Sequence, residues 1–256
     1  MHNRPVVLCI GGHDPTGGAG IQADIETVNA LDARAVSLIT TLTAQDTRNA
    51  TAAWPVSAAA LARQFDTLVD DIRPAAAKIG LLGGTDQIAV LAERIEGLRC
   101  PVVIDPVLAA GGGFQLDPGG LGGAICRQLL PLAALATPNR IEARRLAAND
   151  DADAAAGMLL GHGVGAVLLT GADEANDATV RNRLYRPGLP TREYDWPLLP
   201  QRYHGSGCTL ASACAALLAR GMTLDAAVAE AQAFTWSALE SAEPVGKGQW
   251  LPRRKA

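Results

Sequence analysis

The sequence of 256 residues is poor in aromatic side chains, because Phe, Trp and Tyr together make up only 4% of it. No apolar stretch reaches the roughly 20 residues that a membrane-spanning helix needs. The first residues, Met-His-Asn-Arg-Pro, lack the apolar segment of a signal peptide. These absences predict a cytoplasmic protein with no membrane partner.

Cysteine and positive charge are also scarce. The cysteines are odd in number and form no CxxC pair: Cys9, Cys100, Cys126, Cys208 and Cys214. This spacing argues against a disulfide framework or a structural zinc site and is typical of a reducing compartment. The net charge of -4 provides no broad basic surface, so no nucleic-acid partner is expected. We interpret Arg253-Arg254-Lys255 as a solvated tail.

Short apolar runs alternate with segments of helical periodicity along the chain. The runs predict strands at 5–10, 36–42, 76–81, 101–104, 134–136 and 166–170. Helical spacing predicts helices at 21–31, 57–72, 87–95, 121–130, 141–148, 153–162, 209–220 and 224–239. Such alternation implies a parallel sheet covered on both faces. Because there is no repeat and no linker, residues 1–256 are expected to form one α/β domain.

Polar residues follow several of the predicted strands. They are Asp14, Thr43, Gln45, Asp105, Asn139, Glu142 and Thr170. Ligands of open α/β sheets bind beyond the carboxyl ends of the strands. A single polar residue in such a place is more often a turn or a cap. Their repeated occurrence predicts a ligand site.

The stretch His204-Gly-Ser-Gly-Cys-Thr209 precedes a run rich in Ala and Leu that ends before Gly221. A glycine turn that opens a helix binds anions through unpaired amides and the helix dipole. Ser206 or Thr209 is a candidate cap. Cys208 lies where a thiolate would be stabilised. The alternative is a plain glycine turn with a buried cysteine.

Other catalytic motifs are absent. The sequence contains no GxxxxGK[ST], HExxH or GxSxG pattern. The loop Gly11–Gly20 imitates a GxGxxG fingerprint, but Pro15 interrupts it. A Rossmann dehydrogenase is therefore disfavoured.

Six motifs occur in order: Gly11-Gly-His-Asp-Pro-Thr-Gly-Gly-Ala-Gly-Ile-Gln-Ala-Asp24, Leu42-Thr-Ala-Gln-Asp-Thr47, Lys78-Ile-Gly-Leu81, Asp105-Pro-Val107, Thr137-Pro-Asn-Arg-Ile-Glu142 and Gly205-Ser-Gly-Cys-Thr209. Together they resemble the hydroxymethylpyrimidine and phosphomethylpyrimidine kinases of thiamine biosynthesis, within the ribokinase-like superfamily. The resemblance implies a three-layer αβα sandwich with a mostly parallel central sheet. It also implies ATP- and Mg²⁺-dependent phosphorylation of 4-amino-5-hydroxymethyl-2-methylpyrimidine and of its monophosphate, by a homodimer.

The same resemblance implies a catalytic role for the glycine turn. Gly205, Ser206 and Gly207 match the anion hole whose amides meet the transferring phosphoryl group. Cys208 stands at the position of the general base, which is an Asp in most sugar kinases of the superfamily. A thiol acts as a base when its pKa falls from about 8.5 toward neutrality, and we expect the helix N-terminus to lower it.

Substrate and metal ligands follow from the other motifs. Gln45 matches the residue that hydrogen-bonds the aminopyrimidine edge, since an amide both donates and accepts. The other substrate-binding candidates are Asp14, Ala19, Leu81 and Val107. Glu142 matches the carboxylate of an Asn-x-x-Glu motif that holds the magnesium shell, and Asp105 is expected to share that charge.

The nucleotide-binding candidates are Asn139, Thr170, Gly171 and Lys247. Thr170 and Ala172 stand where many relatives carry Lys and Gly beside the ATP phosphates, and Lys247 is our candidate for a replacement cation. The C-terminal loop 245–250 also departs from the family pattern.

Two other functions stay open. A pyridoxal or pyridoxine kinase of the same superfamily acts on a similar ring with a hydroxymethyl group. The second alternative is a non-catalytic pyrimidine-binding homologue. It is supported by Thr170, which stands where many relatives carry Lys. We interpret Asp24 as a helix-surface carboxylate, His204 and Cys214 as structural, and the four tryptophans as packing residues.

Overall fold

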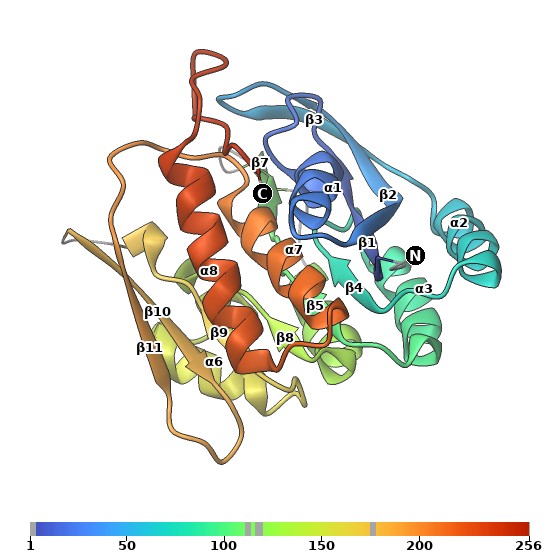
Figure 1. Cartoon of the computed structure of the whole chain (residues 1–256). Coiled ribbons are helices and arrows are strands. Elements are labelled where there is room, and N and C mark those ends of the chain that lie inside the picture. Colours follow the sequence, from blue (N-terminus) through green and yellow to red (C-terminus); the bar gives the residue numbers. More distant parts are fainter. Residues whose placement is uncertain (1–3, 111–113, 116–119, 175–177, 256) are drawn as a thin grey trace.

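The computed structural model describes residues 4–110, 114–115, 120–174 and 178–255. Within these ranges the strands form a nine-stranded sheet of order β11-β10-β9-β8-β5-β4-β1-β2-β3, and β6 pairs with β7 in a small separate sheet (Figure 1). The strands from β9 to β2 in this order are parallel, whereas β3, β10 and β11 are antiparallel to their neighbours. The sheet is therefore mostly parallel, as predicted.

The strands are β1 (Val6–His13), β2 (Arg34–Gln45), β3 (Ala50–Pro55), β4 (Ala76–Ile79), β5 (Val102–Ile104), β6 (Ala109–Ala110), β7 (Phe114–Gln115), β8 (Leu135–Ala136), β9 (Val167–Leu169), β10 (Thr179–Tyr185) and β11 (Arg192–Pro197). The helices are α1 (Gly20–Ala30), α2 (Ala58–Asp71), α3 (Thr85–Ile95), α4 (Leu121–Ala124), α5 (Arg140–Ala147), α6 (Ala152–Leu160), α7 (Ser206–Ala219) and α8 (Leu224–Glu240). Short helical turns are η1 (Glu96–Leu98), η3 (Ile125–Leu129), η4 (Leu130–Leu132) and η5 (Ala172–Glu174).

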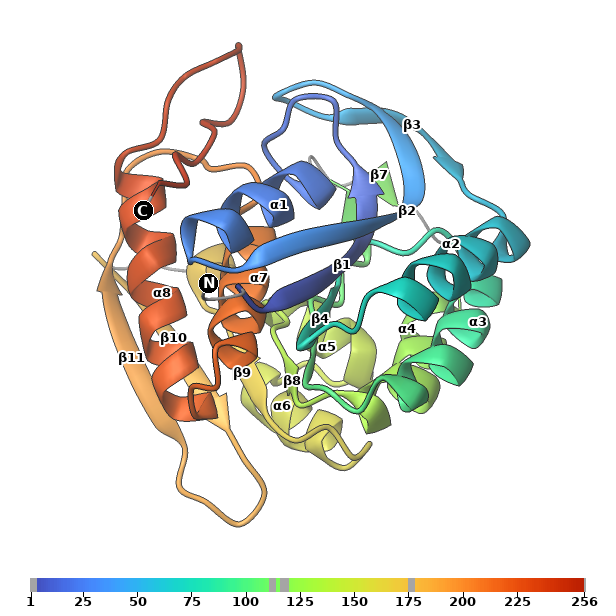
Figure 2. The same ribbon diagram turned by 45° about the vertical axis from the view of Figure 1, so that its right-hand side comes forward.

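Helices cover both faces of the sheet. Val7 and Cys9 of β1 pack in one buried cluster with α1, α7 and α8, while Leu8 and Ile10 pack in the other with α2 to α6. Successive side chains of a strand point to opposite faces, so β1 contributes to both cores. Figure 2 shows α1, α7 and α8 on one side and α2, α3 and α4 on the other. This arrangement confirms the predicted three-layer αβα sandwich.

The central elements agree with the sequence prediction, but the sheet edges were missed. The segments of β3, β10 and β11 are short or polar and only half-buried, so they lack the continuous apolar runs that mark buried strands. β2 continues to Gln45, which places Thr43 and Gln45 on the strand and not after it. The predicted helix 121–130 divides into α4, a π-helical turn η3 and a 3₁₀ turn η4.

Cys9, Cys126 and Cys214 are buried free thiols, as expected for core residues. No helix among the residues described has the length and apolarity to cross a bilayer.

Candidate active site

A cleft of about 600 Å³ lies beyond the carboxyl ends of the parallel strands. The candidate residues that line it are Ala19, Asp105, Val107, Asn139, Glu142, Thr170, Gly205, Ser206, Gly207 and Cys208. The fold thus brings together the proposed anion hole, base and metal carboxylates. Asp14, Gln45, Leu81, Gly171 and Lys247 are absent from its lining.

The glycine turn is held against the first loop of the chain. Gly205 has a φ of +74°, and a Cβ there would lie 2.0 Å from the carbonyl oxygen of Gly18. Only glycine fits so close an approach with a left-handed backbone. No side chain caps α7, contrary to our expectation for Ser206 or Thr209. The Thr209 hydroxyl instead donates to the Gly205 carbonyl at 2.8 Å.

Cys208, in the first turn of α7, is half-buried beside Asp105. Burial raises the pKa of the thiol to about 12, and the negative charges of Asp105 and Asp24 add to this although Lys78 opposes it. Our expectation of a lowered pKa was therefore wrong for the protein without ligands. The helix N-terminus is outweighed by desolvation and by two nearby carboxylates.

A buried ion pair lies beneath this site. Lys78 of β4 and Asp24 of α1 are both fully buried, with the ammonium 2.8 Å from Asp24 Oδ1. The Ser212 hydroxyl also donates to Asp24 Oδ1 at 2.7 Å. Asp24 is thus not the surface carboxylate that we predicted. Helical spacing alone did not reveal it, because its partner lies on a distant strand.

Asp105 is buried and Glu142 is half-buried, and the two acids are close enough to repel each other. Burial raises the pKa of Asp105 to about 6, although Lys78 opposes the shift. Burial and the charge of Asp105 raise the pKa of Glu142 to about 8. Glu142 also completes a capping box: its carboxylate accepts from the Asn139 N–H at 3.0 Å, and the Asn139 side chain accepts from the Glu142 N–H at 2.8 Å.

These two carboxylates fit a magnesium ion. Their pKa values are raised because burial and mutual repulsion disfavour the two ionised carboxylates, and a bound cation would offset that cost. No cluster of three or more metal-binding side chains occurs in the described part of the chain. Magnesium does not need one, since it keeps several waters and takes oxygen ligands from bound phosphates.

The predicted nucleotide residues are only partly brought together. Thr170 and Asn139 form a parallel bridge, and both line the cleft. Gly171 is buried behind them, where its N–H donates to Asn182 Oδ1 at 3.0 Å. Lys247 lies exposed on a loop that packs against Thr47, through a 3.0 Å hydrogen bond from the Gly248 N–H to the Thr47 hydroxyl.

Arg202 is the one lysine or arginine among the described residues that line the cleft. It is exposed, in the segment between β11 and α7. Arg202 is thus a second candidate for the replacement cation, and unlike Lys247 it lines the cleft. A lone exposed arginine in a polar loop gives no sequence signal for this role.

Two tryptophans that we interpreted as packing residues also line the cleft. Trp196 of β11 and Trp236 of α8 stack with ring centroids 6.3 Å apart. Their indole planes, with Val180 and Leu239, form an apolar part of the cleft. The sequence did not reveal this because the two rings meet only through the antiparallel hairpin β10–β11.

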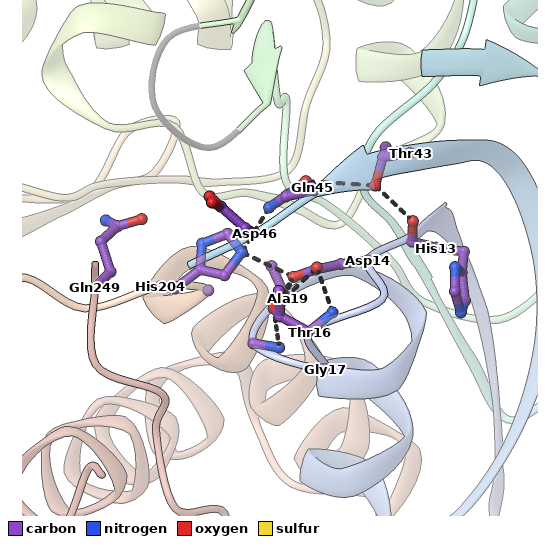
Figure 3. Close-up of polar contacts among 12 residues, drawn as sticks. His13, Asp14, Thr16, Gly17, Ala19, Thr43, Gln45, Asp46, His204 and Gln249 are labelled. Atoms are coloured by element: carbon purple, nitrogen blue, oxygen red, sulfur yellow. Dashed lines mark hydrogen bonds and ion pairs between the residues drawn. The ribbon is translucent and has the colours of Figure 1, made fainter. Parts of the chain in front are cut away.

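A polar network joins the substrate-side residues (Figure 3). His204 Nε2 lies 2.8 Å from Asp14 Oδ2 and 2.7 Å from the side-chain amide of Gln45. The Asp14 carboxylate also accepts from the backbone N–H groups of Thr16 and Ala19, each at 2.9 Å. We predicted only a structural role for His204; the structure places it between two candidate substrate residues.

Leu81 follows β4 and is half-buried. A Cβ at Gly12 would lie 2.8 Å from its Cδ2, so its side chain packs against the end of β1.

Arg254 near the C-terminus is buried, so our interpretation of a solvated tail was wrong for this residue. Its guanidinium donates to the Thr209 hydroxyl at 2.9 Å and to the carbonyls of Gly17 and Gly18 at 3.4 and 2.5 Å. It therefore ties the first loop to α7.

The αβα sandwich, with a glycine turn that has no side-chain cap and shares one cleft with Asp105 and Glu142, is that of a phosphotransferase of the ribokinase-like class. The chain belongs to the phosphomethylpyrimidine kinase family, which it matches over residues 14–252.

Named relatives agree with this assignment. A hydroxymethylpyrimidine/phosphomethylpyrimidine kinase of Streptomyces coelicolor is 36% identical, over 95% of this chain and 92% of its own. The thiamine biosynthesis bifunctional protein ThiED of Geobacter sulfurreducens is 37% identical, over 96% of this chain and 51% of its own. The pyridoxal kinase of Staphylococcus aureus in complex with ADP has a TM-score of 0.91 at 29% identity, over 99% and 94% of the two chains.

Proposed function

We propose that residues 1–256 form a single kinase domain that transfers phosphate from ATP to 4-amino-5-hydroxymethyl-2-methylpyrimidine, and then to its monophosphate, in thiamine biosynthesis. The observation that carries the proposal is the uncapped turn Gly205–Cys208 facing Asp105 and Glu142 in one cleft. The full-length relatives named for this activity support it.

The glycine turn binds the phosphoryl group in transfer. The N–H groups of Ser206, Gly207 and Cys208 belong to the first turn of α7, where backbone amides have no partner within the helix. Such fixed donors stabilise charge that develops in the transition state.

Cys208 takes up the proton of the substrate hydroxyl in the first step. With a pKa of about 12 the thiol is protonated in the protein without ligands. Its side chain hydrogen-bonds Asp105, so offsetting the charge of that carboxylate would lower the pKa of the thiol. In the second step the acceptor is an already ionised phosphate, which needs no base.

Asp105 and Glu142 would hold Mg²⁺ together with its waters. When bound, the ion supplies positive charge to the phosphate oxygens. Arg202 is the candidate point charge beside the nucleotide phosphates, in place of the lysine that relatives carry at position 170. The stacked Trp196 and Trp236 offer an apolar surface for the nucleotide base.

A second candidate function is pyridoxal kinase, because a solved pyridoxal kinase shares the fold at a TM-score of 0.91. An assay of ADP release with the pyrimidine, its monophosphate and pyridoxal side by side tests both. We expect the first two to be the better substrates. Preference for pyridoxal would replace the main proposal, and no release with any of the three would favour the non-catalytic homologue.

The homodimer and the cytoplasmic location implied by the resemblance and the composition belong to the same proposal. Sedimentation of the purified chain tests the first, and fractionation of cells tests the second.

A further inference from the structure

The ring of His204 is placed to control Gln45. His204 lies four residues before Cys208, is 5% exposed, and contacts both Asp14 and Gln45 through the same nitrogen, Nε2 (Figure 3). A single ring nitrogen either donates or accepts a hydrogen bond. The proton positions of the whole network therefore follow from one assignment.

Asp14 settles that assignment. Its Oδ1 accepts from the Thr16 N–H and its Oδ2 accepts from the Ala19 N–H. Burial alone would raise the pKa of Asp14, but hydrogen bonds from His204 and Thr16 outweigh it and hold the pKa below its ordinary value. An ionised carboxylate has no hydrogen to give. His204 Nε2 must therefore carry the proton, and its single hydrogen is shared between Asp14 Oδ2 and the Gln45 side chain in a three-centre hydrogen bond.

Gln45 must then turn its oxygen to His204. With Nε2 of Gln45 2.7 Å from His204 Nε2, two donors would face each other. Rotating the amide by half a turn exchanges Oε1 and Nε2 without any change of shape, and only the hydrogen-bond network distinguishes the two orientations.

Thr43 independently requires the same orientation. Its hydroxyl donates to the His13 carbonyl at 2.9 Å and lies 3.4 Å from the other end of the Gln45 amide. A hydroxyl has one hydrogen, which the shorter contact uses. The second contact is satisfied when the Gln45 N–H donates to the hydroxyl oxygen. Both neighbours of Gln45 thus call for Oε1 toward His204 and Nε2 toward Thr43.

We propose that His204, anchored by Asp14, is a positioning residue that fixes the Gln45 amide and thereby sets selectivity for an aminopyrimidine over pyridoxal. This rests on the proposed function and on the role that the family resemblance implies for Gln45, which is to hydrogen-bond the aminopyrimidine edge. The amide keeps one lone pair on Oε1 and one hydrogen on Nε2 for a ligand. The fixed oxygen accepts from the 4-amino group, and the fixed N–H donates to the ring nitrogen.

Pyridoxal differs at the position that matters. Next to its hydroxymethyl group it carries an aldehyde, which accepts a hydrogen bond but cannot donate one. A Gln45 amide free to rotate would serve either substrate. An amide fixed with its oxygen toward the ligand leaves two acceptors facing each other, and such unpaired polar contacts reject a substrate strongly.

His204→Phe tests the proposal, because it keeps a ring of similar size and removes the donor. We expect the pyrimidine Kd by calorimetry and its KM to rise roughly 10- to 100-fold, with kcat changed much less. The Kd of pyridoxal should stay constant or fall, so the ratio of the two constants shrinks. His162→Phe, at an exposed position after α6, is the matched control and should leave both constants unchanged.

A Gln45→Ala background separates positioning from a general loss of structure. If His204 acts through Gln45, His204→Phe adds no further rise in Kd there. Additive effects of the two substitutions, or an unchanged Kd ratio in a His204→Phe protein with wild-type thermal unfolding, would overturn the inference. A Gln45→Ala protein that binds the pyrimidine as tightly as wild type would instead refute the substrate role of Gln45, and with it that part of the proposed function.

Discussion

The proposed substrate half of the site and its proposed metal half differ in how their polar groups are satisfied. Asp105 and Glu142 of the metal half line the cleft, whereas Asp14 and Gln45 of the substrate half do not. On the substrate side, Asp14 is an ionised carboxylate surrounded by donors, and His204 connects it to Gln45. On the metal side, burial raises the pKa of Asp105 to about 6, and burial together with the charge of Asp105 raises the pKa of Glu142 to about 8. The charge of the substrate half is satisfied within the chain, whereas a nearby cation would favour the ionised forms of both acids in the metal half.

This difference follows from the cost of burying charge. A buried polar group must be hydrogen-bonded, and a buried charge must be paired. Asp14 meets that requirement within the chain, so the substrate half is preorganised. Asp105 and Glu142 each accept a hydrogen bond, but burial still disfavours their charged forms, so a bound cation would stabilise the metal half. The glycine turn contacts both halves, because Gly205 packs against Gly18 of the first loop and Cys208 hydrogen-bonds Asp105.

Removing the proposed base is expected to have the largest effect on rate, and to slow the first phosphorylation step much more than the second. Cys208→Ala should lower kcat for the pyrimidine alcohol by roughly 10²- to 10⁴-fold, the usual contribution of a general base. Phosphorylation of the monophosphate should fall far less, since its acceptor is ionised. Single-turnover rates with each substrate measure the two steps.

Cys100→Ala is the matched control, because Cys100 is a free thiol just before β5, at the opposite end of the strand from Asp105. It should leave both rates unchanged. Equal losses in the two steps for Cys208→Ala would count against the base role.

Neutralising one acid of the metal half comes next. Glu142→Gln keeps an acceptor for the Asn139 N–H, so the capping box and the melting temperature should persist. The Mg²⁺ concentration for half-maximal rate should rise roughly 10- to 100-fold.

The same variant should lose a pH dependence. Below pH 8 the Glu142 carboxyl is largely protonated without a cation, given its pKa of about 8, so Mg²⁺ displaces a proton and binds more tightly as pH rises. Titrations of Mg²⁺ between pH 6 and pH 9 should show this slope in the wild type and a shallower one in Glu142→Gln. Identical slopes would mean that Glu142 is only a cap.

Removing a contact that holds the first loop is expected to lower the free energy of unfolding more than it lowers the reaction rate. Arg254→Met removes the donor that the Gly17 and Gly18 carbonyls share. Leaving such buried groups unpaired costs about 1–3 kcal/mol, which lowers the melting temperature by roughly 2–4 °C for each kcal/mol. Arg253→Met, at an exposed neighbour, should change stability by less than about 0.5 kcal/mol. Equal shifts in the two variants would argue against the tie between the first loop and α7.

The smallest expected effect is on the KM for ATP, when the cation that is proposed to replace the missing lysine near the nucleotide phosphates is removed. Arg202→Gln should raise the KM for ATP about fivefold, since an exposed charge near a phosphate contributes about 1 kcal/mol. Lys247→Gln should leave it unchanged, because Lys247 is absent from the lining of the cleft. The reverse result would restore our prediction from the sequence.

The sequence alone determined the fold class and the family. Apolar runs and helical periods suffice for a buried parallel sheet, because both signals are local, and the order of the motifs Gly11–Asp24 to Gly205–Thr209 indicated the family. The same local signals did not predict β3, β10 and β11, because these half-buried strands at the sheet edges have no continuous apolar pattern. What only the tertiary structure decided are the pairings between distant segments: Lys78 with Asp24, Arg254 with the first loop, Trp196 with Trp236, and His204 with Gln45. Burial and long-range charge set these contacts and the raised pKa of Cys208, and neither is encoded in the spacing of neighbouring residues.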